Sequence, residues 1–287
     1  NGDRLVKFVA FKKPFEGAVF TEYLLQIEEA RDVYSNDIFR AYPITVKDLK
    51  EAGTEYENET QEKMKIGTYV GNKWGGKYLR APDIFFTILE KGKDKLVKLS
   101  DIAANIKRNN LESFQEWFIC KDRYLDNKNQ FPFLHSLKDI KGIHVNLNEL
   151  RSFKKTKDNK NIDYIKPDII SNRFVGERMF FIEGGEFLVN DSFFIANLKD
   201  NIDKKSALLL LNSTLSLLLL EVIGRKTFAV GVMYIYGPEF RNCILLNPSL
   251  LKDKKINKIY NQFTIRAIKS IFEECGVNPK SGIPIEE

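Results

Sequence analysis

The sequence predicts an α+β fold, in which helices combine with antiparallel or mixed sheets around one central buried helix. The densest apolar run in the chain, at residues 206–223, predicts that helix. Short apolar segments bounded by glycine, proline or asparagine predict the strands. The chain has 287 residues, of which 43% are hydrophobic and 29% charged, so it has the size and composition of a folded globular protein with a substantial core.

The central helix is predicted by residues 207–211 and 215–223, which are apolar on nearly every face. Asp203 can cap its first turn and Gly224 can close it in a left-handed conformation, which gives a helix of about five turns. Polar residues, including Glu221, interrupt the run, and no aromatic belt flanks it. A membrane span is therefore not favoured.

The N-terminal region predicts one strand and two helices. Residues 4–12 alternate as in a strand, and residues 19–33 carry apolar side chains at helical spacing. Residues 46–52 predict a second, short helix that Thr45 opens and Gly53 closes.

Residues 54–65 are polar and charged, which predicts a solvated helix or linker and a domain boundary. Glycines then bracket Lys73 and Trp74 in a basic and aromatic loop, and an apolar helix at residues 84–89 follows Pro82. Neither glycine-rich phosphate-binding order is present, so nucleotide binding is not favoured. Trp74 is more readily explained as a packing residue than as one that stacks on a base.

Residues 95–106 predict a strand followed by a short turn, and apolar runs at 117–120 and 131–134 predict further strands. After the turn comes a loop with two cations and two amides: Lys107, Arg108, Asn109 and Asn110. Arginine and asparagine are the side chains that read guanine and adenine edges in the major groove, although a solvated loop explains the same residues.

The second half of the chain predicts a β-hairpin from residues 178–183 and 186–190, which a Gly-Gly pair separates. A strand at residues 193–196 follows the hairpin, and another at 227–236 follows the central helix. The amphipathic segment at 256–274 predicts a closing helix.

The net charge of +6 and the pI of about 9.0 favour a polyanionic partner. Three cysteines, far apart and in no metal or redox spacing, indicate a reducing compartment, so we expect a cytoplasmic protein. His135 and His144 have no ligand partner at helical spacing, so a zinc site is not favoured. The chain begins at Asn1 rather than Met, and we expect a piece of a longer protein.

One acidic pattern formally matches a metal-dependent nuclease, in which two carboxylates hold Mg²⁺ and a lysine supports the attacking water. It consists of Asp168 after a proline, then Asp203 followed by Lys204 and Lys205. The spacing is long, Pro-Asp pairs form turns, and Asp203 is already explained as a helix cap. The sequence therefore assigns no catalytic residue and no metal ligand.

Several short segments, taken together and in order, resemble a known family. They are Lys73-Trp74, YLRAPDIF at 78–85, LSDIA at 99–103, LNSTL at 211–215 and EVIGR at 221–225. In this order they resemble the C-terminal specificity region of Taq-type adenine-N6 DNA methyltransferases, which type IIG restriction-modification enzymes share. The resemblance covers residues 66–248 and implies a Taq-type specificity domain built around the central buried helix.

The resemblance implies three parts: residues 1–65 as the end of the catalytic domain plus a helical linker, 66–248 as the target recognition domain, and 249–287 as a helical tail. In that family the N-terminal domain binds S-adenosylmethionine and methylates a flipped adenine at an Asn-Pro-Pro-Tyr type motif. The pairs Asn247-Pro248 and Asn278-Pro279 do not supply that motif. The resemblance therefore implies no cofactor in this chain, S-adenosylmethionine in the parent enzyme, and an N-terminal methyltransferase domain as partner.

The function implied is recognition of a sequence in double-stranded DNA while the catalytic domain extrudes the adenine. The candidate phosphate contacts are Lys73, Lys77, Arg80, Arg225 and Lys226, with Trp74 beside them as a possible stacking residue. The candidate base readers are Lys107, Arg108, Asn109, Asn110 and Arg173. The segment at 106–110 departs from the glycine-rich turn of the family. Two alternatives stay open: a stand-alone specificity subunit acting in trans, and a metal-dependent DNA endonuclease.

Overall fold

The computed structural model describes residues 2–55, 68–69, 75–108, 119–123, 130–154, 166–226, 232–251, 255–278, 280–281 and 283–284. Lys73, Trp74, Asn109 and Asn110 lie outside these residues, as does most of the predicted linker. The chain divides into two compact units, Asn1–Lys93 with Val222–Arg225, and Asp94–Glu221 with Lys226–Glu287. The three-part division made from the sequence stays a prediction.

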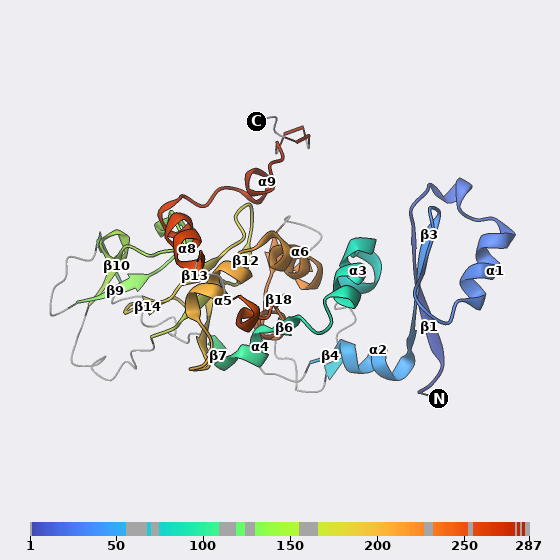
Figure 1. Ribbon diagram of the computed structural model, residues 1–287, viewed down its shortest axis with the longest axis horizontal. Helices are drawn as coiled ribbons and strands as arrows, with labels where there is room; N and C mark the ends of the chain where they lie inside the picture. Colours follow the sequence, from blue (N-terminus) through green and yellow to red (C-terminus); the bar gives the residue numbers. More distant parts are fainter. Residues whose placement is uncertain are drawn as a thin grey trace. The chain divides into compact units, whose positions relative to one another are not determined.

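The first unit is built on a three-stranded antiparallel sheet in the order β1-β3-β2, with α1 beside it (Figure 1). Its strands and first helix are β1 (Leu5–Phe11), α1 (Thr21–Glu29), β2 (Tyr34–Ser35) and β3 (Phe39–Thr45). The ring of Tyr23 on α1 lies 6.3 Å from that of Phe39 on β3. The strand and the helix predicted for residues 4–33 are thus confirmed.

The rest of the first unit is a series of short elements. They are the 3-10 turn η1 (Phe15–Gly17), α2 (Val46–Gly53), the paired strands β4 (Thr54–Glu55) and β5 (Thr68–Tyr69), the π-helical turn η3 (Gly75–Arg80) and α3 (Asp83–Lys91). Thr45 caps α2 as predicted, because its hydroxyl accepts a hydrogen bond from the Asp48 amide at 3.1 Å. Pro82 immediately precedes α3, where its missing N–H costs nothing.

The second unit contains several small sheets. The first, in the order β13-β11-β15-β7, is antiparallel and consists of β7 (Ala103–Arg108), β11 (Ile169–Asn172), β13 (Phe181–Glu183) and β15 (Phe193–Leu198). The next, in the order β14-β9-β10-β8, consists of β8 (Ile119–Arg123), β9 (Gln130–Leu134), β10 (Arg151–Lys154) and β14 (Leu188–Val189). Smaller sheets join β12 (Phe174–Val175), β17 (Met233–Tyr234) and β16 (Arg225–Lys226), and pair β6 (Leu96–Lys98) with β18 (Ile244–Leu246).

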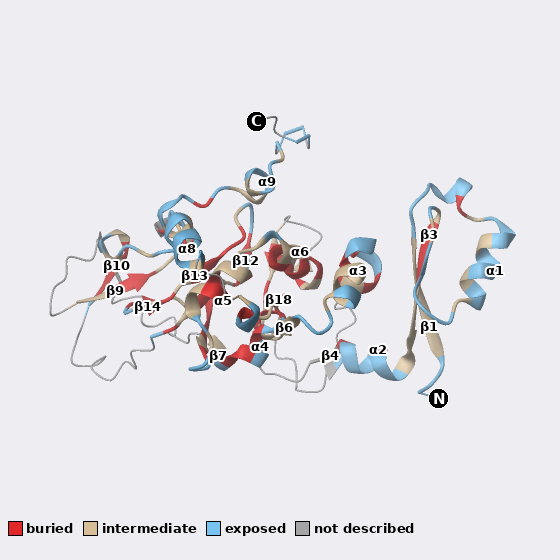
Figure 2. Cartoon of the chain, viewed as in Figure 1, coloured by how far each residue is buried: buried red, intermediate tan, exposed pale blue. Residues whose placement is uncertain are grey.

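Short helices surround these sheets. They are α4 (Leu99–Ile102), α5 (Lys204–Leu211), α6 (Thr214–Ile223), α7 (Gly237–Arg241), α8 (Ile256–Ile265) and α9 (Ile271–Glu274), with 3-10 turns η5 (Leu137–Asp139), η6 (Leu147–Glu149) and η7 (Pro248–Leu250). Figure 2 shows buried residues on α4 and α5 and mostly exposed residues on α1. In the core, Phe240 of α7 lies 6.2 Å from Phe181 and 5.7 Å from Phe194 between ring centroids.

The central helix predicted at 203–224 is wrong as a single helix, because α5 and α6 are bent by 61° at Asn212 and Ser213. The side-chain oxygen of Asn212 accepts from the Phe181 amide at 2.8 Å, and its amide nitrogen donates to the Phe181 carbonyl at 3.1 Å. This tertiary contact ends α5, whereas the sequence shows only a polar residue within an apolar run at this position. The Asp203 cap and the burial of both segments are confirmed.

Gly224 does not adopt the predicted left-handed conformation; within the described ranges, the glycine with positive φ is Gly276. No single helix in those ranges is long and apolar enough to cross a membrane, and α5 and α6 reach that length and composition only as a bent pair.

The β-hairpin predicted at 178–190 is wrong. β13 pairs with β11, whereas β14 runs parallel to β9 in another sheet. Gly184 donates a backbone hydrogen bond to the Asp168 carbonyl, and a Cβ at Gly184 would collide with the carbonyl oxygen of Pro167. The glycine pair therefore marks a close approach of two backbones rather than a two-residue turn.

The closing helix predicted at 256–274 is also wrong as one element. α8 ends at Ile265, and the chain then runs extended while Ile268 and Ile271 donate backbone hydrogen bonds to Lys141 and Glu177. Ser270 starts α9 with a capping box to Glu273. The strand at 193–196 is confirmed by β15, and Lys107 and Arg108 lie at the end of β7 rather than in the predicted loop.

Candidate nucleic-acid interface

Two of the predicted base readers lie at the same end of the β13-β11-β15-β7 sheet. Arg108 is the last residue of β7, and Arg173 follows the last residue of β11. β15 runs between these strands, with Phe193 opposite Asn172 and Phe194 opposite Arg108. The sheet therefore brings together two cations that are far apart in the sequence.

The turn at residues 190–192 holds both arginines. The Asn190 side chain accepts hydrogen bonds from the amide and the hydroxyl of Ser192, each at 2.9 Å. Arg108 donates to the main-chain carbonyl of Asp191 at 3.0 Å and to its carboxylate at 3.1 Å. The Ser192 carbonyl accepts from the backbone amide of Arg173 at 2.9 Å. Asp191 thus neutralises part of the Arg108 charge and fixes the direction of its guanidinium.

The guanidinium of Arg173 lies against two aromatic rings. The guanidinium carbon of Arg173 lies 4.9 Å from the ring centroid of Tyr236 and 5.2 Å from that of Phe174. Its backbone is fixed on the other side as well, because the Ile235 amide donates to the Arg173 carbonyl at 2.9 Å. Only 6% of the residue is exposed.

The aromatic side chains around Arg173 come from β12 and from β17 with the residues that follow it. Phe174 meets Tyr234 edge to face at 5.2 Å, and Tyr234 stacks on Tyr236 at 6.1 Å. Phe174 is 39% exposed. Phe174, Tyr234 and Tyr236 are not among the site residues predicted from the sequence. The available signal was the alternation of Tyr234 and Tyr236 in a predicted strand.

Lys107 is half-buried in β7 opposite Ile195. Asn109 and Asn110, the other predicted base readers, lie outside the described residues. The roles of Lys107, Arg108 and Arg173 in base reading stay predictions.

The predicted phosphate contacts that the structure describes belong mainly to the first unit. The Arg80 guanidinium donates to the Gly224 carbonyl at 3.2 Å, which brings Arg80 close in space to the residue before Arg225. The Lys77 ammonium lies 5.4 Å from the ring centroid of Tyr78. The side chain of Lys226 lies outside the described part of the chain. We treat Lys77, Arg80 and Arg225 of the first unit and Arg108 and Arg173 of the second unit as two groups of basic residues.

Tyr78 anchors η3, the turn that carries Lys77 and Arg80. Its ring stacks on Phe8 at 4.9 Å and lies 4.9 Å from the ring of Tyr42. Burial, followed by the nearby Tyr42 and Asp48, raises the pKa of Tyr78 to about 12. The tyrosine therefore stays neutral and acts as a packing residue at physiological pH.

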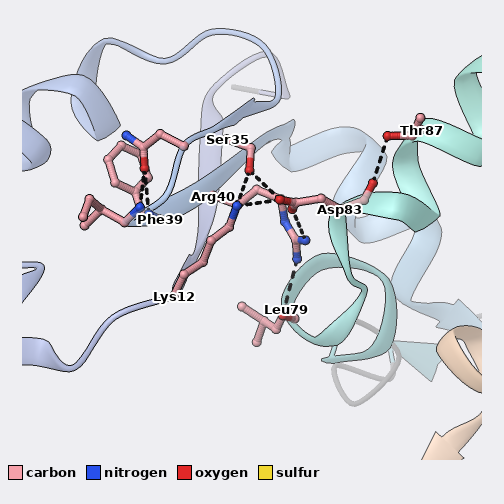
Figure 3. A network of polar contacts seen from close by, with 9 residues as sticks. Lys12, Ser35, Phe39, Arg40, Leu79, Asp83 and Thr87 are labelled. Carbon is pink, nitrogen blue, oxygen red and sulfur yellow. Dashed lines mark hydrogen bonds and ion pairs between the residues drawn. The ribbon is translucent and has the colours of Figure 1, made fainter. Parts of the chain in front are cut away.

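A polar network joins α3 to the sheet of the first unit (Figure 3). The carboxylate of Asp83 accepts hydrogen bonds from Lys12, from Ser35 at 2.9 Å and from Arg40 at 2.9 Å. The pKa of Asp83 is lowered to about 2: the hydrogen bond from Lys12 is the largest cause, partial burial opposes it, and the hydrogen bonds from Arg40 and Ser35 add to the lowering. This network orients the helix that directly follows Arg80.

The acidic residues of the nuclease alternative have structural partners. Asp168 accepts from the Leu198 amide at 2.9 Å and lies 3.8 Å from the Lys204 ammonium. Asp203 accepts from the Ser206 amide at 2.8 Å. Within the described ranges, no three His, Cys, Asp or Glu residues come together as a group that could hold a metal ion. The helix cap and the strand contact account for both carboxylates.

No protein-family model matches the chain, and no curated protein matches it. Among solved structures, the chain is similar to the type IIG restriction endonuclease BpuSI, with a TM-score of 0.59 and 8% identity over 96% of this chain and 36% of that one. It also matches the S subunit of a type I restriction-modification system from M. genitalium (TM-score 0.35, 12% identity, 58% of this chain, 37% of that chain). The HsdS subunit from Thermoanaerobacter tengcongensis matches at TM-score 0.35 and 11% identity, over 75% of this chain and 59% of that chain.

The likeness to BpuSI shows the fold of the chain. It confirms the predicted α+β class and, at the level of fold, the resemblance to type IIG enzymes. The chain spans about a third of the length of BpuSI. The two matches at TM-score 0.35 are too distant to compare folds.

Proposed function

We propose that the chain recognises a specific sequence in double-stranded DNA, as the specificity part of an adenine-N6 DNA methyltransferase of a restriction-modification system. One observation carries the proposal. Two arginines, one ending a strand and one following another, lie at one end of a sheet, beside an exposed phenylalanine and two tyrosines, in a chain with a net charge of +6. The likeness of the fold to a type IIG restriction endonuclease supports it.

The two groups of basic residues suit different tasks. Phosphate contacts need accessible cations and little geometric precision, which fits the exposed Arg80 and the half-buried Lys77 and Arg225. Base edges need donors held in a fixed direction, which fits Arg108 on Asp191 and Arg173 against its rings. We therefore assign positioning to the first group and sequence reading to the second.

A catalytic domain belongs to the proposal as a partner. α1 has no buried residue, and the first unit exposes a set of large apolar side chains: Phe11, Phe15, Phe20, Leu24, Leu25 and Val33. β1 is an edge strand, which pairs with β3 on one side in the sheet that the structure describes. Such a surface is what a neighbouring domain covers. We propose that this neighbour is the methyltransferase domain, that it binds S-adenosylmethionine, and that the whole protein is a cytoplasmic type IIG enzyme.

The proposal is tested by retention of a randomised duplex pool on the 287-residue chain. We expect retention at about 50 mM salt that falls by roughly two orders of magnitude or more at about 200 mM, because each phosphate contact releases a counterion. Sequencing of the retained duplexes should give a short motif that contains adenine.

Retention without any enriched motif would show non-specific binding and contradict sequence recognition. No retention at either salt concentration, with folding shown by circular dichroism, would contradict DNA binding by this chain. Cleavage of the pool with Mg²⁺ that Asp168→Ala abolishes would instead establish the nuclease alternative. A specificity subunit acting in trans gives the same motif and needs a separately encoded catalytic chain for methylation.

A further inference from the structure

Arg173 is a buried residue whose main chain is hydrogen-bonded and whose charged side chain makes no hydrogen bond to any residue that the structure describes. Nε is thus a buried donor without an acceptor, which costs free energy that the two ring contacts do not recover in full, whereas the two terminal nitrogens are not fully buried. Nε of Arg40 is also buried without an acceptor, but the terminal nitrogens of Arg40 donate to Asp83 and Leu79. The terminal nitrogens of Arg173 have no acceptor within the described residues, which indicates an acceptor that is absent from the free chain.

A second arginine of the same unit shows what a structural role looks like. Arg178 also stacks on an aromatic ring, with its guanidinium carbon 5.5 Å from the Phe180 centroid. Its terminal nitrogens, however, donate to the carbonyls of Ile140 at 3.1 Å and Leu137 at 2.8 Å. Arg178 is thus a comparison for Arg173: it is half-buried rather than buried, and its terminal donors are satisfied.

We propose that Arg173 is a specificity-determining residue that reads a guanine in the DNA; this rests on the proposed function. The rings of Tyr236 and Phe174 lie against the guanidinium and restrict its orientation, and hydrogen bonds to Ser192 and Ile235 fix its main chain. Terminal donors in a fixed plane match O6 and N7 of guanine, which accept two parallel hydrogen bonds in the major groove.

A phosphate is the other acceptor that DNA offers, and it fits this position less well. It is strongly hydrated and charged, so bringing it against Phe174 and Tyr236 costs more than bringing a neutral base edge. A planar base also gains contact with the rings, which a tetrahedral phosphate does not. The exposed Arg80 and the half-buried Lys77 and Arg225 of the first unit are assigned to phosphates at lower cost.

The test uses the duplex selected by the wild-type chain and a set in which each G·C pair is replaced by A·T. For Arg173→Lys we expect loss of discrimination at one G·C position by roughly 5- to 150-fold, with the other positions unchanged. The dependence of log Kd on log salt should keep its slope, because the charge and the phosphate contacts remain. Arg178→Lys should bind with unchanged sequence preference.

Three results of the binding experiment would overturn the inference. If Arg173→Lys keeps the wild-type motif at every position, Arg173 reads no base. If Arg173→Ala weakens all duplexes equally and lowers the salt slope by about one, Arg173 contacts a phosphate. If the wild-type chain selects no motif at all, the proposed function has failed and the inference with it.

Stability gives an independent readout. Arg173→Met keeps the apolar stem and removes an unsatisfied buried cation, so its thermal midpoint should stay within about 2 °C of the wild type or rise. Arg178→Met loses satisfied hydrogen bonds and should melt at least about 4 °C lower. A fall for Arg173→Met as large as that for Arg178→Met would make Arg173 a structural residue and overturn the inference.

Discussion

The ion pair between Arg40 and Asp83 should show a strong asymmetry between its two partners. The Arg40 guanidinium donates to Asp83 at 2.9 Å, and the Arg40 side chain is 5% exposed, whereas Asp83 is 46% exposed. The remaining contacts of the guanidinium are a long hydrogen bond to the Leu79 carbonyl, 3.5 Å, and the ring of Phe86, 4.8 Å away. Removing Asp83 leaves a buried cation, whereas removing Arg40 leaves a solvated carboxylate.

The sizes of the two effects follow from that difference. Loss of one partner of a fully buried pair costs roughly 3–5 kcal/mol, and because water reaches Asp83 we expect about 2 kcal/mol for Asp83→Ala. Arg40→Met keeps the buried stem without the charge and should cost less than about 1 kcal/mol. The double variant should therefore be more stable than Asp83→Ala alone, by about 1 kcal/mol.

Urea unfolding of the four proteins of this double-mutant cycle measures these differences. Asp37→Ala is the control, because Asp37 is exposed in the same unit and should change the free energy of unfolding by less than about 0.5 kcal/mol. Additive effects, with the double variant less stable than Asp83→Ala, would refute the reasoning that the buried cation causes the loss.

The same carboxylate predicts a pH dependence. Folding lowers the pKa of Asp83 from 3.8 to about 2, so its contribution is present above pH 3.8 and is lost as the pH falls toward 2. At 1.36 kcal/mol per pKa unit the ceiling is about 2 kcal/mol, and the 46% exposure of Asp83 reduces this to about 1 kcal/mol. Urea midpoints between pH 5 and pH 2 should fall less for Asp83→Asn than for the wild type, and parallel curves would contradict the prediction.

Two further substitutions test the corrections to the predicted fold. Asn212→Ala leaves the backbone N–H and C=O of Phe181 without their side-chain partner and should cost about 2 kcal/mol in urea unfolding. The control Asn242→Ala changes an exposed residue and should cost about 0.5 kcal/mol or less. Equal costs would contradict the tertiary explanation of the helix break. Gly184→Ala forces a Cβ onto a backbone carbonyl and should lower the thermal midpoint by at least about 5 °C. The control Gly176→Ala has open space around its Cβ and should leave the thermal midpoint unchanged. An unchanged midpoint for Gly184→Ala would contradict the close approach of the Gly184 and Pro167 backbones.

The features predicted correctly from the sequence are those whose physics is local. The Thr45 and Asp203 caps depend on a side chain and an amide within one helical turn, and both are confirmed. The hairpin at Gly184 failed because its glycine pair reflects a contact with Pro167, which no neighbouring residue reveals. The prediction of a single central helix failed for the same reason, since the break at Asn212 depends on its contact with the distant Phe181.

The candidate site follows the same division. Arg173 could be selected as a basic residue of the right type. Its position against Phe174 and Tyr236 depends on the antiparallel pairing of β12 with β17, which joins residues far apart in the chain. Arg173 and Arg108 come to the same end of the sheet because β15 pairs with β11 on one side and with β7 on the other. These strands are distant from one another in the sequence. The alternate aromatic residues of the sequence indicate a strand, but not that this strand pairs beside Arg173, and nothing in the sequence indicates the nearness of Arg108.

Photo-crosslinking is the most direct test of where the chain holds DNA. The duplex selected by the wild-type chain would carry 5-iodouracil in place of each thymine in turn, and the adducts would be mapped by mass spectrometry. If the sheet end carries recognition, adducts should form on peptides containing Phe174, Tyr234 or Tyr236, because aromatic side chains at a base-reading surface meet the groove. Adducts confined to the first unit, with the duplex shown to be bound, would contradict that assignment.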